Sequence, residues 1–212
     1  MEILNEISGS VQRGDHENAA VLTKQAVADG VPPKEILDGG LIAAMDIVGE
    51  RFRKHEIFLP DVLLAAKAMY AGMDVLKPLL IEGDVPNLGK VVIGSVRGDL
   101  HDIGKNLVGI MLRGAGFEVI DLGNDVAPER FVDAAAEEGA HVIGMSALLT
   151  TTMPTMKAVV ELLEGRGFSD DVKTIVGGAP VSADFAREIG ADAYGFDAAN
   201  AVVRVKELMD IS

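Results

Sequence analysis

The chain has 212 residues, a formal net charge of -14 at pH 7 and no cysteine. The lack of cysteine excludes disulfides, thiolate metal sites and cysteine nucleophiles. The acidic balance argues against nucleic acid or an anionic membrane as a partner, because both bind cationic surfaces. No apolar run approaches the roughly 20 residues of a membrane span, and the first residues lack the pattern of a signal peptide, so we expect a cytoplasmic protein.

The N-terminal region is expected to be helical throughout. Apolar residues recur at helical spacing in four segments, which begin near residues 3, 15, 34 and 60. Gly30 with Pro32 and Pro33 separates the second segment from the third, and a turn at 54–59 separates the third from the fourth. Helices of this length joined by short connections predict a small antiparallel four-helix bundle.

From Lys90 onward, short apolar runs alternate with helical patterns. This alternation predicts a five-stranded parallel sheet flanked by helices, with either Rossmann-like or flavodoxin-like strand order. The polar segment 84–89 contains glycine and proline and is expected to be a linker, so the predicted domains are 1–83 and 90–212. The expected strands are 91–95, 117–121, 142–146, 174–176 and 193–195, and the expected helices are 103–114, 128–138, 153–166, 182–189 and 198–210.

The loop after the first expected strand carries Asp99, His101 and Gly104 in the pattern D-x-H-x-x-G. Ligands of open α/β sheets bind at such strand ends. An imidazole there can offer one nitrogen to a metal while a carboxylate holds the N–H of the other. Alternatively, Asp99 only caps the following helix and His101 is a solvated loop residue.

Two further strand ends carry small or hydroxylated residues. Hydroxyl groups run from Ser146 to Thr152 after the third strand, and Gly177 and Gly178 follow the fourth. Thr152 could simply cap the next helix, and the glycine pair could simply form a turn. Together they could instead leave room for a large planar ligand, because bare backbone allows close approach.

The ordered D-x-H-x-x-G, S-x-L and G-G motifs resemble the signature of cobalamin-binding domains that hold the corrinoid base-off and histidine-on. Examples are methionine synthase and the small corrinoid proteins of methylotrophic methyltransferase systems. The resemblance covers nearly the whole chain, since residues 1–83 are similar to the family's helical cap. It implies that His101 is the axial ligand of cobalt and that Asp99 and Thr152 form a proton relay to it. The family's methionine synthases have serine at the position of Thr152.

The resemblance also implies which other residues contact the cofactor. Met45, Val48 and Phe52 would form an apolar lid over the upper face of the corrin, although residues of these types at helical spacing are more often ordinary bundle core. The remaining cofactor-binding residues implied are Asp102, Ile103, Gly104, Ser146, Leu148, Thr150, Gly177, Gly178 and Tyr194. The loop 123–126 could touch the corrin edge or only lead into a helix.

The function implied is that of a corrinoid methyl carrier in one-carbon metabolism, with cobalamin or a related corrinoid, such as methylcobalamin or hydroxocobalamin, as its cofactor. A substrate-specific methyltransferase would load a methyl group onto Co(I). A second methyltransferase would take it from methyl-Co(III) to tetrahydrofolate or coenzyme M. A reductive activase is a further expected partner, and the chain alone is not expected to be catalytic.

The methyl donor is left open among methylamines, quaternary amines, methanol and methoxylated aromatics. Other functions with the same binding domain are a cobalamin-dependent sensor or regulator, which would be expected to have a basic DNA-binding module, and the small subunit of a mutase. A flavodoxin-like protein without cofactor is the last alternative. His16, His55 and His141 stand at no recognisable zinc-site spacing and are expected to be structural or solvated.

Overall fold

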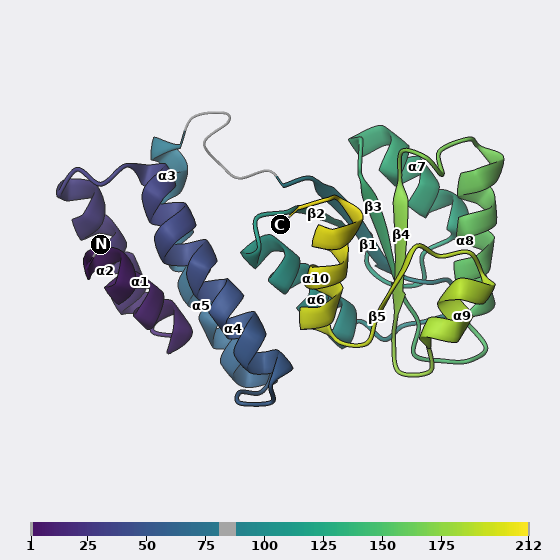
Figure 1. Ribbon diagram of the computed structural model, residues 1–212, viewed down its shortest axis with the longest axis horizontal. Coiled ribbons are helices and arrows are strands. Elements are labelled where there is room, and N and C mark those ends of the chain that lie inside the picture. Colours follow the sequence, from purple (N-terminus) through teal and green to yellow (C-terminus); the bar gives the residue numbers. More distant parts are fainter. Residues whose placement is uncertain (1, 81–87, 212) are drawn as a thin grey trace. The chain divides into compact units, whose positions relative to one another are not determined.

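The computed structural model describes residues 2–80 and 88–211, and its ribbon is drawn in Figure 1. The chain forms two compact units, one helical and one built on a sheet, with the main division just before Leu88. Most of the expected linker, 84–87, lies outside the described residues, so the linker remains a prediction. Within the described ranges, no helix is long and apolar enough to cross a membrane.

The helical unit follows the order expected from apolar spacing. Its elements are α1 (Glu2–Gln12), α2 (His16–Ala28), α3 (Pro33–Ile36), the π-helix η1 (Leu37–Ile42), α4 (Ala43–Arg53), α5 (Leu59–Leu76) and the 3-10 turn η2 (Lys77–Leu79). Asp15 caps α2 by accepting the Asn18 N–H at 3.0 Å, and Asp61 accepts the Phe58 N–H at the start of α5 at 2.8 Å. Local capping therefore sets these two helix starts.

The predicted third helix is confirmed as a continuous stretch, but the sequence did not indicate the π-helical turn within it. Gly39 and Gly40 fall in η1, where the bare backbone packs against α1. The glycine of α5, Gly72, allows a close approach of another helix, because an added Cβ would lie 2.7 Å from a Leu41 methyl group. The small residues of this unit thus allow tight helix packing.

The second unit alternates strands and helices along the chain. Its strands are β1 (Lys90–Ser95), β2 (Glu118–Asp121), β3 (Val142–Ser146), β4 (Lys173–Gly177) and β5 (Ala193–Gly195). They are parallel in the order β2-β1-β3-β4-β5, so the flavodoxin-like alternative is the correct one. The helices are α6 (Ile103–Gly114), α7 (Pro128–Glu138), α8 (Pro154–Gly165), α9 (Ala183–Glu188) and α10 (Ala198–Leu208).

The two faces of the sheet have different roles. One face packs under α7, α8 and α9 in a buried cluster that includes Phe131, Ile143 and Met156, and Figure 1 shows α6 and α10 on the other face. On that other face Ser95 pairs with Ser146 and Ser146 pairs with Gly177. Gly177 in turn pairs with Gly195. A row of small residues therefore crosses the carboxyl edge of the sheet beneath α6 and α10.

Candidate functional site

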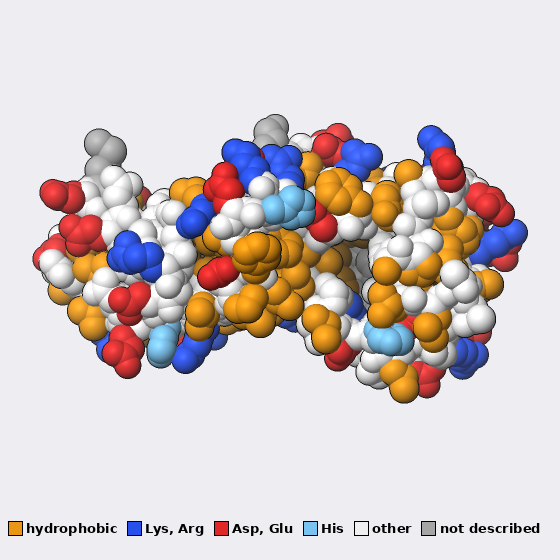
Figure 2. Space-filling model, turned by 90° about the horizontal axis from the view of Figure 1, so that it is seen from below, with side chains coloured by type: hydrophobic (Ala, Val, Ile, Leu, Met, Phe, Trp, Pro, Cys, Tyr) orange, Lys and Arg blue, Asp and Glu red, His pale blue; other side chains and the backbone are white. Residues whose placement is uncertain are grey.

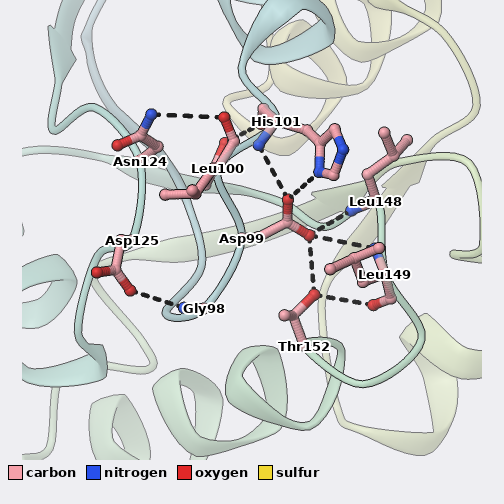
Figure 3. A network of polar contacts seen from close by, with 10 residues as sticks. Gly98, Asp99, Leu100, His101, Asn124, Asp125, Leu148, Leu149 and Thr152 are labelled. Carbon is pink, nitrogen blue, oxygen red and sulfur yellow. Dashed lines mark hydrogen bonds and ion pairs between the residues drawn. The ribbon is translucent and has the colours of Figure 1, made fainter.

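The loop between β1 and α6 lies at the topological switch point of the sheet, because the neighbours of β1 on its two sides are β2 and β3. His101 is in this loop, and its side chain is 51% exposed. Its Nδ1 lies 2.8 Å from Asp99 Oδ1, which also accepts the backbone N–H of His101 at 3.1 Å (Figure 3). A carboxylate can only accept, so Nδ1 carries the proton and Nε2 is the nitrogen able to bind a metal.

The other oxygen of Asp99 faces the loop after β3. Asp99 Oδ2 accepts the backbone N–H groups of Leu148 at 2.7 Å and Leu149 at 3.2 Å, and the Thr152 hydroxyl lies 2.8 Å away. The Asp99 side chain is fully buried. Burial raises the pKa of Asp99, but the hydrogen bonds from Leu148, His101 and Thr152 outweigh it and hold the pKa well below its usual range. The carboxylate is therefore a fixed anion.

Thr152 does not cap α8, which was the alternative left open for it. The N-cap of α8 is Met153, and the hydroxyl of Thr152 lies 2.8 Å from both Asp99 Oδ2 and the carbonyl oxygen of Leu149. One hydroxyl proton can be given to only one of these acceptors at a time. Thr152 can thus donate to Asp99 or turn its proton to the backbone. Likewise, Asp99 is no cap for α6, which begins at Ile103.

A pocket of about 320 Å³ opens between the sheet and the pair α6 and α10. The strands contribute small residues to its wall, among them Gly144, Ser146, Gly177 and Gly195. The helices contribute mainly aliphatic side chains, with Val108 and Leu112 from α6 and Ala201 and Val205 from α10. The pocket is therefore a slot with an apolar lining that begins beside the His101 loop.

Large apolar side chains are exposed near His101 and after β5. Leu100 and Ile103 flank His101 in sequence and are 69% and 71% exposed, and Phe196 follows β5 and is 62% exposed. Figure 2 shows hydrophobic side chains reaching the surface among the charged ones. Exposed groups of this size at a strand edge are suited to contact an apolar ring system.

The structure brings most of the expected site residues together at the carboxyl edge of the sheet. Asp99, His101, Leu148 and Thr152 share one hydrogen-bonded network, while Gly104, Ser146, Gly177 and Gly178 line the slot. Thr150 is exposed in the same loop as Leu148, and Asp102 accepts the Asn106 N–H through its carbonyl oxygen at 2.7 Å. Met45 and Val48 are buried and Phe52 is half-buried, all on α4.

Tyr194 requires a correction. Side chains of a strand alternate between faces, and Gly195 lines the slot, so the side chain of Tyr194 packs against the hydrophobic cluster on the opposite face. The expectation that its side chain approaches the ligand is therefore wrong. Phe196 and Asp197, which follow β5, line the slot in its place.

Lys105 and Asp121 were missed as site residues. Lys105 lines the slot, with a side chain that is only 4% exposed and an ammonium 2.6 Å from each Asp121 oxygen. A lysine among the apolar positions of α6 and an aspartate at a strand end were the available signals. Neither signal indicates burial by itself, because both residues are usually solvated.

The loop 123–126 and His141 have structural roles. Asp125 Oδ1 accepts the Gly98 N–H at 2.7 Å, and the Asn124 side chain donates to the Leu100 carbonyl at 3.5 Å (Figure 3). His141 Nδ1 accepts the Lys90 N–H at 3.1 Å at the opposite edge of the sheet. His141 is thus structural, as expected.

The side chains at this site fit a metal that is already coordinated mainly by a cofactor. Among the described residues, no group of three or more His, Cys, Asp or Glu side chains could hold a metal ion. His101 offers a single oriented nitrogen beside an apolar slot. A corrinoid supplies four nitrogens to its cobalt and has a nucleotide tail for which the slot provides space, so the residues present fit that cofactor.

Comparison with known proteins agrees with this geometry. Two models that are both described as a B12 binding domain match residues 89–204 and 3–77. Trimethylamine corrinoid protein 2 of Methanosarcina mazei is 45% identical over 212 residues, with 99% of this chain and 97% of the relative covered. Dimethylamine corrinoid protein 1 of Methanosarcina acetivorans is 44% identical over 209 residues, with 98% of each covered.

Solved structures give the same result. The methanol:cobalamin methyltransferase complex MtaBC of Methanosarcina barkeri matches with a TM-score of 0.89 at 31% identity, covering 100% of this chain and 81% of that one. A cobalamin-binding protein of Desulfitobacterium hafniense matches with a TM-score of 0.81 at 33% identity, covering 97% and 98%. The chain belongs to the B12-binding family of corrinoid proteins.

Proposed function

We propose that this protein is a corrinoid methyl carrier that binds cobalamin base-off with His101 as the lower axial ligand. The bound cobalt would supply the chemistry, since it can accept a methyl group from one methyltransferase and give it to a second. The single observation that carries the proposal is the orientation of His101. Its Nδ1 is held by a buried anion, and its Nε2 is left for a metal beside an apolar slot.

Asp99 would hold the axial imidazole in one tautomer. A carboxylate that accepts N–H groups from two loops cannot rotate without breaking several hydrogen bonds, so it fixes the ring orientation as well as the Nδ1 proton. Thr152 would donate its hydroxyl proton to Asp99 or to the Leu149 carbonyl, which would modulate how strongly Asp99 draws on the imidazole. This is the role proposed for the relay.

The slot would take the nucleotide tail of the cofactor. Gly144, Gly177 and Gly195 have no side chains, so a flat base could lie against the sheet between α6 and α10. Ser146 would contact the tail, and exposed Leu148 would contact the corrin rim. The helical unit would cover the upper face of the corrin through Met45, Val48 and Phe52, and segment 84–89 would let it move aside.

The proposed partners follow from the names of similar proteins. Two relatives named above are a trimethylamine and a dimethylamine corrinoid protein, so we infer that the first partner is a methyltransferase for a methylated amine. A second methyltransferase, with tetrahydrofolate or coenzyme M as acceptor, and a reductive activase would complete the cycle. We also infer a cytoplasmic location, where such partners would act.

Reconstitution of the full chain with hydroxocobalamin tests the proposal. After free cofactor is removed, the wild type should retain one cofactor per chain, and its reduced Co(II) form should show an axial nitrogen splitting by EPR. His101→Ala should lose the protein nitrogen signal. His141→Ala serves as the matched control, because it removes an imidazole from the same unit at the opposite edge of the sheet. Failure of the wild type to retain cofactor would refute the proposal.

The methyl donor can be tested with the same preparation. The reduced wild type should be methylated by a trimethylamine or dimethylamine methyltransferase in the presence of the matching amine, as followed by the visible spectrum. Methylation by a methanol methyltransferase alone would refute the inference about amines and leave the carrier role intact.

A further inference from the structure

An ion pair outside the relay, between the buried Lys105 and the partly exposed Asp121, connects the slot to the loop that carries His101. Lys105 lies in the first turn of α6, four residues after the axial histidine. Its ammonium lies 2.6 Å from both oxygens of Asp121 and 2.7 Å from the side-chain oxygen of Asn106. An ammonium has three N–H donors, so all of them have acceptors and the group has one preferred orientation.

Asp121 also holds the loop after β2 through a hydrogen bond. Its Oδ1 also accepts the Gly123 N–H at 2.9 Å, while the Gly123 carbonyl accepts the Ser95 N–H at 3.0 Å. Gly123 has a positive φ of 82° and Asp125 one of 54°. Glycine adopts a positive φ without steric cost, but for Asp125 this conformation is less favourable and depends on contacts around it. The bond from Gly123 to Asp121 is one of the contacts that hold this loop.

The loop after β2 in turn holds the residues that directly precede His101. Asp125 binds Gly98 through its side chain, and its N–H donates to the Asp99 carbonyl at 3.1 Å. Asn124 reaches the Leu100 carbonyl, as drawn in Figure 3. A series of polar contacts therefore runs from Lys105 through Asp121 and the loop after β2 to Gly98, Asp99 and Leu100, which precede His101.

The burial of the two partners differs. The Lys105 side chain is 4% exposed, whereas that of Asp121 is 28% exposed. An ammonium left without its partner in a buried site is strongly unfavourable, but a partly exposed carboxylate can be hydrated. A buried pair adds little net stability compared with apolar residues of the same size, so stability alone does not account for an ion pair at this position.

We propose that Lys105 and Asp121 are positioning residues for axial ligation: the pair fixes the loop after β2, and through it the orientation in which His101 meets the cobalt. This inference rests on the proposed function. It assigns no contact of Lys105 with the cofactor, because its three donors are already directed to protein oxygens.

The test uses Lys105→Met, Asp121→Asn and the double variant, each reconstituted as the full chain with cobalamin and reduced to Co(II). EPR then gives the ratio of His-ligated to unligated cobalt. We expect Asp121→Asn to lower this ratio about tenfold, Lys105→Met to lower it less, and the double variant to lie closer to the wild type than Asp121→Asn. Lys90→Met is the matched control, because Lys90 pairs with Glu118 at the opposite end of β2 from Asp121.

A wild-type ratio in both folded single variants would overturn the inference. If Asp121→Asn does not fold, the ratios of Lys105→Met and of the double variant test the inference. Both are expected to fold, because neither leaves a buried ammonium without its partner. Cobinamide, which lacks the nucleotide tail, separates two routes. Persistence of the ligation defect with cobinamide supports action through the loop, whereas its disappearance would show action on the tail and overturn the inference. If the reconstituted wild type itself shows no EPR signal that depends on His101, the proposed function is refuted.

Discussion

Gly104 provides a substitution with opposite effects on stability and on cofactor binding. It is the second residue of α6 and lines the slot, and a Cβ added there would meet no atom within 4 Å. Glycine is less favourable than alanine in a helix by about 0.5–1 kcal/mol. Gly104→Ala should therefore stabilise the cofactor-free protein and raise its melting temperature by about 1–4 °C.

The same methyl group should weaken cofactor binding. If the corrinoid lies against the bare backbone at Gly104, a Cβ there overpacks the contact, which typically costs about 1–3 kcal/mol. Because 1.4 kcal/mol corresponds to a factor of ten in affinity, the dissociation constant for cobalamin should rise roughly 5- to 150-fold. Titration of the cofactor-free protein, followed by its visible spectrum, measures this change.

Gly165 offers the matched control for this experiment. It is the last residue of α8, remote from the residues that line the slot, and an added Cβ there also meets no atom within 4 Å. Gly165→Ala should leave the affinity for cobalamin unchanged. The reasoning is refuted if Gly104→Ala binds cobalamin as tightly as Gly165→Ala does, since the cofactor would then not approach the start of α6.

Variants at three further positions test the network and the strand ends. Thr152→Val removes the hydroxyl group that donates to Asp99 and should lower the free energy of unfolding by about 1.5–3 kcal/mol. Thr152→Ser keeps this donor and loses only the methyl group that packs near Gly98, so it should lower the free energy of unfolding by about 1 kcal/mol. Urea titrations measure both values. A larger loss in the serine variant would contradict this ranking. The pKa of Asp99 in the folded protein is lowered below its ordinary value of 3.8, so its ionised form stabilises the fold above about pH 4 and that contribution is lost as the pH falls further. The stability difference between wild type and Asp99→Asn should accordingly be constant from pH 5 to 8 and shrink below about pH 4, and a difference that shrinks already near pH 6 would exclude Asp99 as its source. Gly178 has a φ of 126°, and an added Cβ would lie 1.9 Å from the Ala147 carbonyl, so Gly178→Ala should cost about 3 kcal/mol or more; a urea midpoint equal to that of the wild type would refute this.

Much of the fold follows from patterns that lie within short stretches of the chain. Buried parallel strands are continuous apolar runs, so residues 91–95 and 142–146 were predictable within one residue of β1 and β3. Asp99 and His101 of the D-x-H-x-x-G motif lie in the loop after β1, and loops after parallel strands gather at one edge of the sheet. The place of His101 could therefore be predicted without knowing the strand order.

The strand order itself was not predictable, because local patterns do not record which strands are neighbours. Flavodoxin-like order puts β3 beside β1, which brings the Leu148 N–H to Asp99 across a sequence separation of 49 residues. The expectation that the Tyr194 side chain approaches the ligand was wrong for a related reason. The strand β5 is only three residues long, and Ala193 and Gly195 around the tyrosine give no apolar alternation that indicates a face.

The sequence alone determined the class of fold and the placement of His101 and of the carboxylate beside it, because each depends on residues that are close together in the chain. Tertiary structure decided the burial of Asp99 and Lys105, the partners of Thr152 and the row of small residues that forms the slot. These features arise when segments far apart in sequence pack together and exclude water. Burial and the pairing of charges are properties of that packing, so no single segment of the chain encodes them.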